Sequence, residues 1–427
     1  MREYSVLILA DLFPPQFAPR ASYLANFLAN QEDWRVTVVT EHIEQKHSGS
    51  HGQIFASFEE KCAVHRVPLV PKPSVWRSLA EALWGEKGKR LERYILQHFA
   101  AKSFDVILAC TYRTFPVPTA VRLAQRWHIP VVADCRDLVE QYSRNDFLPY
   151  RPFARWGWGE NLLMGLLKRH FIAARTRALR KTNCVTTVSE WHRLCLQKLH
   201  PQQRVLSIAN GYDEAFFRAT QVRSERFRIV FTGRVLSLAM RDPSLLFEAL
   251  ASEALESIVA SGSLSIDWYV DEDSQRMLQQ LLHSYPHQVA SLNNFHSMVP
   301  FEQVPALLQE ASVVLLLGNK EEKYGPHGMV TTKLFEAMAV GRPILMTRSD
   351  EGVAAALLKQ YGAACAAIDV ESVVAFIEKY FTQWKEKGYT SPEGIDRSFV
   401  EQYSRWQMAT KIKTLLLQLL QKWHQEP

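Results

Sequence analysis

The chain has 427 residues, of which 47% are hydrophobic and 22% are charged, and its 50 basic and 44 acidic side chains leave a formal net charge of +6. This length exceeds one ordinary core and fits two domains of roughly 200 residues each. The composition excludes a disordered chain, and no run of ~18 uncharged apolar residues predicts a membrane-spanning helix.

The start of the chain and its cysteines both indicate the cytoplasm. An apolar strand pattern begins at residue 5 without a cleavage-site motif, so we do not expect a secretory signal. The six cysteines are scattered and form no Cys-x-x-Cys pair, which favours free thiols in a reducing compartment.

Short apolar runs recur through the first half of the chain, with helical stretches such as 20–30 between them. This alternation is typical of a doubly wound α/β fold with a parallel sheet. The expected strands are 5–10, 35–40, 105–110, 130–134 and 184–189. Because no Gly-x-Gly-x-x-Gly follows the first of them, a dinucleotide cofactor is not favoured.

Polar residues and prolines follow several of these strands. The carboxyl ends of strands in an open α/β sheet face the ligand crevice, so we expect cleft residues there. The first such loop contains Phe13, Pro14 and Pro15 and is followed by Arg20. A stiff structural turn is the alternative.

Two later loops have the same placement. Asp134, Arg136 and Asp137 form an acid–arginine–acid cluster, which is costly to bury unpaired and is therefore a site candidate. A structural Asp–Arg pair that holds the loop is the alternative. Asn210 and Gly211 permit a left-handed turn, either as a hinge that lines the cleft or as a plain turn.

Basic and apolar residues are interleaved at 151–181, where eight Arg or Lys residues accompany one acid, Glu160. Such a face suits an anionic membrane surface. An amphipathic helix packed on the core, with a solvated basic face, is the alternative. No nucleic-acid motif is visible, so we expect no nucleic-acid partner.

A second α/β pattern begins with a strand at 227–232, followed by Gly233, Arg234 and, in the same loop, Arg241. Two arginines beside a glycine turn suit a diphosphate, because each guanidinium binds oxygens in a bidentate manner. A plain surface charge is the alternative. Further on, Asp271 and Asp273 form an Asp-x-Asp, a pattern that holds divalent metals in some enzymes. An acidic N-cap is the favoured interpretation.

Residues 313–345 predict a strand, a glycine-containing loop, a helix that ends at Gly341, and another strand. The loop and the helix N-terminus offer free backbone N–H groups to an anion. Lys333 adds a positive charge in the first turn, and Glu336 lies one turn further, within reach of sugar hydroxyls. A phosphate and a sugar in one pocket indicate a nucleotide-sugar site. The alternative is a tight turn with a solvated Lys333–Glu336 pair worth ~0.2–0.5 kcal/mol.

The run Glu336-Ala-Met-Ala-Val-Gly-Arg-Pro343 resembles the donor-site signature of retaining glycosyltransferases with the two-domain GT-B fold, above all glycosyltransferase family 4. That family has an earlier Glu at the position where this chain has Gly328. The variant Thr-Thr-Lys-Leu-Phe-Glu resembles a subgroup that builds bacterial surface polysaccharides. The loop at 13–20, the Arg-Asp at 136–137 and the Asn-Gly-x-Asp at 210–213 resemble further motifs of the same enzymes.

The resemblance implies roles for particular residues. The residues expected to stabilise the departing diphosphate are Arg234, Arg241 and Lys333. The expected donor-binding residues are Gly233, Gly328, Met329, Val330, Thr331, Thr332 and Glu336. The expected acceptor or cleft residues are Phe13, Pro14, Arg20, Arg136, Asp137 and Asn210. In the fold that this chain resembles, cations and a helix N-terminus can stabilise the diphosphate. The resemblance therefore implies no metal and no cofactor.

The sequence therefore predicts two Rossmann-like domains facing a cleft. These are an acceptor domain (1–213), a linker (214–226), a donor domain (227–395) and a terminal segment (396–427) whose helix crosses back to the first domain. The expected function is retaining transfer of a sugar from a nucleoside-diphosphate sugar to a glycan or lipid-linked acceptor, in the cytoplasm or at the inner face of the cytoplasmic membrane. A nucleotide-sugar epimerase of the same fold and a non-catalytic nucleotide-sugar binding protein are the alternatives.

Overall fold

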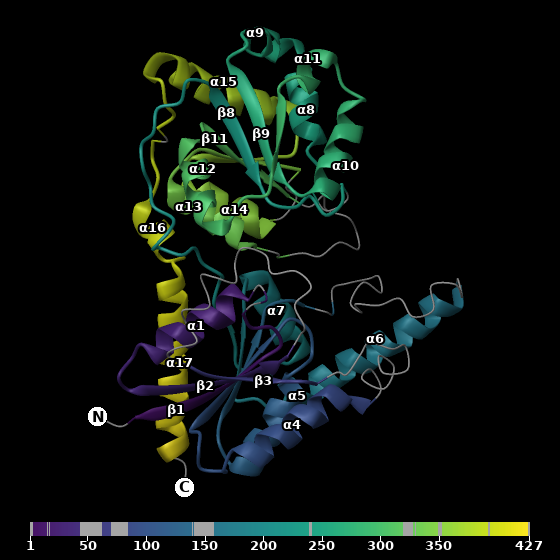
Figure 1. Cartoon of the computed structure of the whole chain (residues 1–427), viewed down its shortest axis with the longest axis vertical. Coiled ribbons are helices and arrows are strands. Elements are labelled where there is room, and N and C mark those ends of the chain that lie inside the picture. Colours follow the sequence, from purple (N-terminus) through teal and green to yellow (C-terminus); the bar gives the residue numbers. More distant parts are fainter. Residues whose placement is uncertain are drawn as a thin grey trace. The chain divides into compact units, whose positions relative to one another are not determined.

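The computed structural model describes residues 3–14, 16, 18–42, 62–69, 84–138, 140, 158–238, 241–318, 328, 330–348, 352–391 and 393–425, without the side chains at 158–161 and 164. The chain divides into two compact units, unit 1 with residues 1–209 and 408–427, and unit 2 with residues 210–407 (Figure 1). These boundaries differ from those expected for the linker and the terminal segment. A β-bridge between Tyr212 and Ser404 lies inside unit 2 and joins the end of the expected acceptor domain to the expected terminal segment.

Unit 1 is built on a seven-stranded sheet in the order β3-β2-β1-β4-β5-β6-β7, with every pair parallel. Its strands are β1 (Tyr4–Ala10), β2 (Trp34–Glu41), β3 (Ala63–Val67), β4 (Val106–Thr111), β5 (Val131–Cys135), β6 (Cys184–Thr187) and β7 (Val205–Ser207). Its helices are α1 (Pro19–Ala29), α4 (Glu86–His98), α5 (Val117–Trp127), α6 (Trp158–Leu179), α7 (Glu190–Leu199) and most of α17 (Arg405–Gln425).

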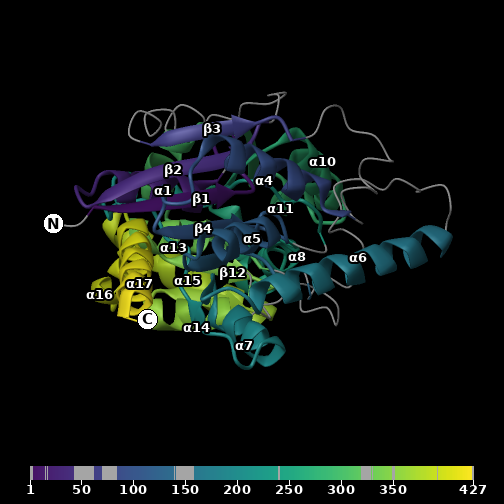
Figure 2. The same ribbon diagram turned by 90° about the horizontal axis from the view of Figure 1, so that it is seen from below.

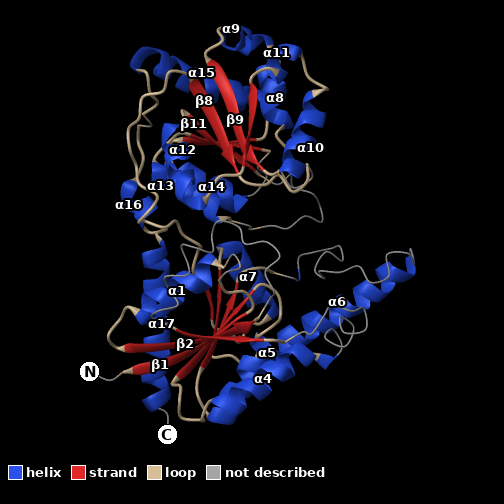
Figure 3. Ribbon diagram, viewed as in Figure 1, coloured by secondary structure: helices blue, strands red, loops and turns tan. Residues whose placement is uncertain are grey.

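Helices cover both faces of this sheet (Figure 3), which explains why its strands read as continuous apolar runs. Along β1, Val6 and Ile8 pack on one face with α1 and α17, whereas Leu7 and Leu9 pack on the other with α4 and α5. The apolar side of α17, from Met408 to Leu420, is part of the first of these cores. The last helix therefore packs on unit 1, as the sequence predicts.

Unit 2 repeats the design with a six-stranded parallel sheet in the order β10-β9-β8-β11-β12-β13. Its strands are β8 (Phe227–Thr232), β9 (Leu264–Val270), β10 (Asn293–Ser297), β11 (Val313–Leu317), β12 (Ile344–Thr347) and β13 (Ala364–Ala367). Its longer helices are α8 (Ser244–Leu250), α10 (Glu272–Leu282), α12 (Val304–Glu310), α13 (Thr332–Val340), α14 (Gly352–Tyr361) and α15 (Val370–Lys387); the short ones are α9 (Glu256–Ala260), α11 (His287–Ala290) and α16 (Arg397–Glu401).

The predicted strand–loop–helix–strand unit is present as β11, α13 and β12, with the two strands adjacent and parallel. Gly341 ends α13 in the left-handed conformation (φ 69°), which a glycine adopts without steric cost. In both sheets the strand order reverses between neighbours, at β1 and β4 in unit 1 and at β8 and β11 in unit 2. Such reversals are where open α/β sheets bind ligands.

Helix α6 packs against α5 through its later turns, and its first turns extend away from the rest of unit 1 (Figure 2). Leu179 is fully buried near the end of the helix, whereas Leu162 and Leu166 are exposed near its start. Among the described helices, none combines the length and apolar character that crossing a bilayer requires.

Candidate donor and acceptor sites

Lys333 and Gly233 come from opposite sides of the strand reversal in unit 2. Gly233 directly follows β8, and Lys333 lies in the first turn of α13, which follows β11. The Lys333 Nζ donates a hydrogen bond to the Thr232 carbonyl oxygen at 2.8 Å and lies 5.3 Å from the centre of the Phe231 ring. The lysine head is therefore held at the carboxyl end of β8.

Gly233 is required for this arrangement on two grounds. Its φ of +114° belongs to the region that favours glycine, and a Cβ placed there would overlap the Lys333 Nζ and lie 2.8 Å from Cε. The group that lies against the backbone at position 233 is thus the Lys333 side chain.

The electrostatic surroundings disfavour the charged form of Lys333. The pKa of this lysine is lowered to about 7, first by burial and then by the nearby charges of Arg241 and Arg234, while Glu336 acts in the opposite direction. The half-buried ammonium therefore shares its surroundings with two guanidinium groups. The arrangement can bind a polyanion, because a bound anion would stabilise all of these cations together.

Arg234 and Arg241 both lie in the loop after β8. The Arg234 side chain is 62% exposed and forms a 3.1 Å ion pair with Asp271. The half-buried Arg241 donates to the Arg234 carbonyl oxygen, and burial lowers the pKa of Arg241. The structure thus brings Arg234, Arg241 and Lys333 together, and Asp271 is the acidic partner that sequence reasoning did not connect with them.

Asp271 has a second role as the N-cap of α10. Its carboxylate accepts from the Ser274 backbone N–H at 3.0 Å, as the capping interpretation predicts. Asp273 pairs with Arg276 on the same helix. Metal independence is not tested by these contacts and stays a prediction.

Most of the remaining residues predicted to bind the donor lie at the N-terminus of α13 or just before it. Thr331 is exposed and is the N-cap in an extended conformation, without a side-chain capping bond. Gly328 has a φ of 69°, and Val330 is buried. Thr332 hydrogen-bonds the Glu336 side chain. Met329 lies outside the described residues.

Glu336 is only 6% exposed, and its closest charged partner is one that sequence reasoning missed. Its Oε1 lies 3.9 Å from Nη2 of Arg405, the first residue of α17. Nη1 of the same guanidinium is 3.1 Å from the Asp213 carboxylate. Burial raises the pKa of Glu336, and Arg405 is the strongest of the charges that lower it.

The turn at Asn210 and Gly211 differs from the expected left-handed turn. Gly211 does not have a positive φ; instead, a Cβ there would lie 2.5 Å from the Tyr403 carbonyl oxygen. A glycine is needed because two backbone segments touch. Asn210 is 9% exposed, so its side chain is largely covered.

In unit 1, Arg20 and Asp134 form a buried ion pair. Arg20 Nε and Nη2 contact the two Asp134 oxygens at 2.8 and 2.9 Å, and Thr186 donates to the same carboxylate at 2.6 Å. Although burial raises the pKa of Asp134, Arg20 holds it below its usual range. The pair locks α1 to β5. The acceptor role expected for Arg20 stays a prediction, as does that of the buried Phe13; the Pro14 carbonyl accepts from Arg66 at 2.6 Å.

The Asp134–Asp137 loop contains two further predicted residues. Arg136 donates to the Tyr112 hydroxyl and lies 4.2 Å from the centre of its ring. Burial raises the pKa of Asp137. The backbone oxygen of Asp137 accepts from Arg175 at 3.1 Å.

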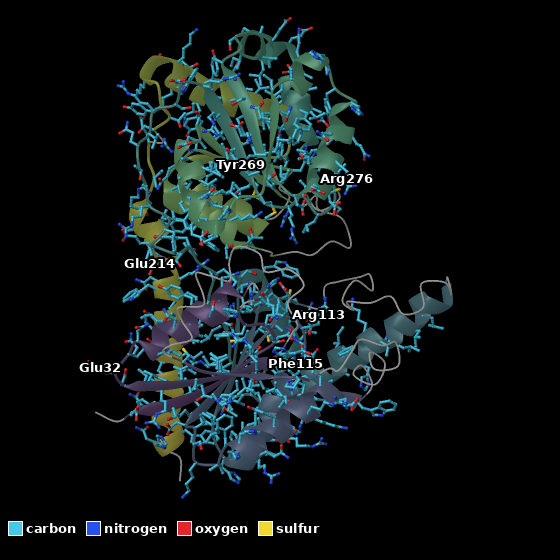
Figure 4. The ribbon with its side chains drawn as sticks, viewed as in Figure 1. Glu32, Arg113, Phe115, Glu214, Tyr269 and Arg276 are labelled. Atoms are coloured by element: carbon cyan, nitrogen blue, oxygen red, sulfur yellow. The ribbon has the colours of Figure 1, made fainter. Side chains whose placement is uncertain are left out.

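Carboxylates and a lysine that sequence reasoning missed lie at the same edge of the sheet. Asp11 follows β1, and Glu41 ends β2. Lys87 Nζ, from α4, contacts them at 3.5 and 2.6 Å and lies 4.1 Å from the centre of the Phe115 ring, labelled in Figure 4. Asp11 and Glu41 could have been predicted from the sequence, because ligands bind at the carboxyl ends of strands. No signal in the sequence indicates Lys87.

The structure corrects one part of the basic-face hypothesis. A solvated basic face would include Arg175, but this residue is fully buried, with Glu140 at 3.4 Å from its Nη1. Arg169, Arg177 and Arg180 are exposed. The exposed basic face is thus smaller than the stretch 151–181, of which 151–157 lie outside the described residues.

Comparisons with known proteins agree with this architecture. Residues 18–211 match the family model of the glycosyl transferase 4-like domain. No curated protein matches the chain in sequence.

Several solved structures are similar to this chain over nearly its whole length. Sucrose-phosphate synthase from Thermosynechococcus elongatus is 12% identical with a TM-score of 0.65, covering 98% of this chain and 100% of its own. Anabaena HepE in complex with UDP is 13% identical with a TM-score of 0.62, covering 97% and 100%. A glycosyltransferase from Rickettsia africae is 12% identical with a TM-score of 0.63, covering 98% and 99%. The chain therefore has the two-domain GT-B fold, as the sequence predicts, and its residues 18–211 resemble the glycosyl transferase 4-like domain.

Proposed function

We propose that this protein is a retaining glycosyltransferase that moves a hexosyl-type sugar from a nucleoside-diphosphate sugar to a glycan or lipid-linked acceptor in cell-surface polysaccharide synthesis. The observation that carries the proposal is the Lys333 ammonium held over Gly233, beside Arg234 and Arg241, where α13 begins. HepE, which has the same fold, binds UDP and UDP-glucose, and this supports a nucleotide sugar as the donor.

In the proposed reaction, the bond between the anomeric carbon and the diphosphate oxygen breaks, and the negative charge that develops stays on the diphosphate. Arg234, Arg241, Lys333 and the N–H groups of α13 would stabilise that charge without a metal ion. The acceptor oxygen bonds to the anomeric carbon on the same face, and the leaving phosphate takes the acceptor proton. Glu336 would accept hydrogen bonds from the ribose hydroxyls. The family resemblance supports retention at the anomeric carbon.

The acceptor would bind unit 1 at the carboxyl ends of its strands, in the cytoplasm. A lipid-linked acceptor would bring the protein to an anionic membrane surface. The exposed Leu162 and Leu166 of α6, with Arg169 and Arg177 on the same helix and Arg180 just after it, support α6 as the contacting element.

A thermal-shift panel of nucleoside diphosphates and their sugars, with and without EDTA, tests the donor site. A ligand at about 100 times its dissociation constant should stabilise the protein by ~2.7 kcal/mol. A shift with one nucleotide family that EDTA leaves unchanged supports the site and its metal independence. No shift with any nucleotide contradicts the proposal, and a shift that EDTA abolishes contradicts metal independence.

Turnover separates the competing functions once the donor is known. Transfer to a glycan supports the proposal, whereas conversion of the donor to an epimer without an acceptor indicates the epimerase. Arg234→Ala or Lys333→Ala should then cost ~2–4 kcal/mol of transition-state stabilisation. Arg276→Ala is the matched control, since this exposed arginine, labelled in Figure 4, pairs with Asp273 on its own helix. Wild-type turnover of both site variants would remove these assignments.

A further inference from the structure

Arg405 is a buried arginine, 3% exposed, whose guanidinium lies between two carboxylates of unit 2. Nη1 is 3.1 Å from Asp213 Oδ2, and Nη2 is 3.9 Å from Glu336 Oε1. Nε donates to the Gly211 carbonyl oxygen at 3.3 Å. Nε and Nη1 thus have hydrogen-bond acceptors that fix the orientation of the planar group, and Nη2 faces Glu336 at ion-pair distance.

Backbone hydrogen bonds fix the position of Arg405 independently of its side chain. The Arg405 N–H donates to the Tyr212 carbonyl at 2.8 Å, and the Tyr212 N–H donates to the Tyr403 carbonyl at 3.0 Å. Only a glycine fits at position 211, because a Cβ would lie 2.9 Å from the Arg405 nitrogen. The guanidinium is therefore presented to Glu336 from a rigid base.

The Arg405 guanidinium favours the charged form of Glu336. Burial raises the pKa of Glu336, and Arg405 is the largest of the influences that oppose the rise, ahead of Lys333. Removal of Arg405 would leave two buried carboxylates, Glu336 and Asp213, without the cation they share. A buried carboxyl in that situation takes a proton and loses part of its capacity to accept hydrogen bonds.

We infer that Arg405 is a positioning residue of the donor site, which holds the Glu336 carboxylate in place so that it faces the vicinal hydroxyls of the donor nucleoside's ribose. Asp213 anchors the guanidinium on its other side. This role rests on the proposed function, because it requires a nucleotide at α13. Arg405 itself need not touch the donor.

The test compares UDP with 2′,3′-dideoxy-UDP, which lacks both ribose hydroxyls, by calorimetric titration of the full chain. The wild type should prefer UDP by roughly 10-fold or more, the size expected for hydrogen bonds to a charged acceptor. Glu336→Gln and Arg405→Met should both reduce this preference toward one, whatever their effect on the diphosphate that the two ligands share. A general folding defect would weaken both ligands equally, and that result overturns the inference.

Arg405→Lys and a pH series provide the second measurement. The lysine keeps a charge near Glu336 and should retain part of the preference for UDP. As the pH is lowered, Arg405→Met should lose its preference for UDP at a higher pH than the wild type does, because Glu336 takes up a proton more readily in the variant. If Arg405→Met does not fold, the lysine variant alone decides: an unchanged preference overturns the positioning role, and a reduced one supports it.

The outcomes also separate this inference from the proposed function. A wild type that binds neither UDP nor any other nucleoside diphosphate overturns both. If the wild type prefers UDP and the Arg405 variants keep the same preference at every pH, only the role of Arg405 is overturned.

Discussion

The Lys333 side chain occupies the space that a side chain at position 233 would fill, so glycine and lysine form one structural feature at the carboxyl end of β8. The two residues lie far apart in the chain, on either side of β9, β10 and β11. The lysine position depends on the glycine, and this dependence can be tested directly.

Gly233→Ala should displace the Lys333 head and weaken nucleoside-diphosphate binding by at least about 10-fold, as expected when a charged hydrogen bond is lost. The positive φ should also cost about 1–2 kcal/mol of folding stability. Gly262→Ala is the matched control, since Gly262 has a φ of +68° and, among the described residues, no atom lies within 4 Å of a Cβ added there. We expect both variants to lose similar stability, and only Gly233→Ala to lose nucleoside-diphosphate binding. Equal binding by both variants would contradict the coupling.

Nucleoside-diphosphate binding should be accompanied by proton uptake near pH 8. The pKa of Lys333 is about 7 in the free protein because the group is buried among cations. A bound diphosphate favours the ammonium form and raises that pKa, so affinity should fall as the pH rises above about 7. Calorimetry in buffers of different ionisation enthalpy measures the uptake. Lys333→Arg should abolish it, because arginine stays charged; an uptake that persists in this variant would assign the proton to another group.

Arg20→Met should destabilise unit 1 by roughly 3–5 kcal/mol, because it leaves the buried Asp134 carboxylate without its partner. Arg35→Met removes an ion pair whose side chains are 68% and 51% exposed, and should cost no more than about 1 kcal/mol. Urea denaturation compares the two. Similar losses for both variants would mean that Arg20 does not have the structural role described above.

Binding to anionic lipid vesicles should depend on the exposed face of α6. Neutralising Arg169, Arg177 and Arg180 together should release the protein from vesicles containing anionic lipid. The control neutralises Lys359, Lys385 and Lys387, which are also exposed, on unit 2. Co-sedimentation is the measurement, and high salt should mimic the α6 variant. Release by the control variant as well would indicate an effect of net charge alone.

The sequence by itself determined the two parallel sheets, because continuous apolar runs and the spacing of helices between them are local patterns. It also determined the β11–α13–β12 unit, since Gly341 ends the helix wherever the chain is placed. The chemistry of the donor side could be proposed from residue types alone, as with Lys333 and the two arginines after β8.

Only the tertiary structure decided which charges meet. Arg405 joins Asp213 and Glu336 across long stretches of chain, and no periodic pattern in the sequence encodes such a contact. The full burial of Arg175 likewise depends on how α6 packs, which a count of basic residues does not reveal. Gly211 needs to be a glycine because the backbone at 403–405 lies against it, and a local turn preference does not predict that contact. Helix and strand patterns are local, whereas the partner of a buried charge is determined by packing between distant segments.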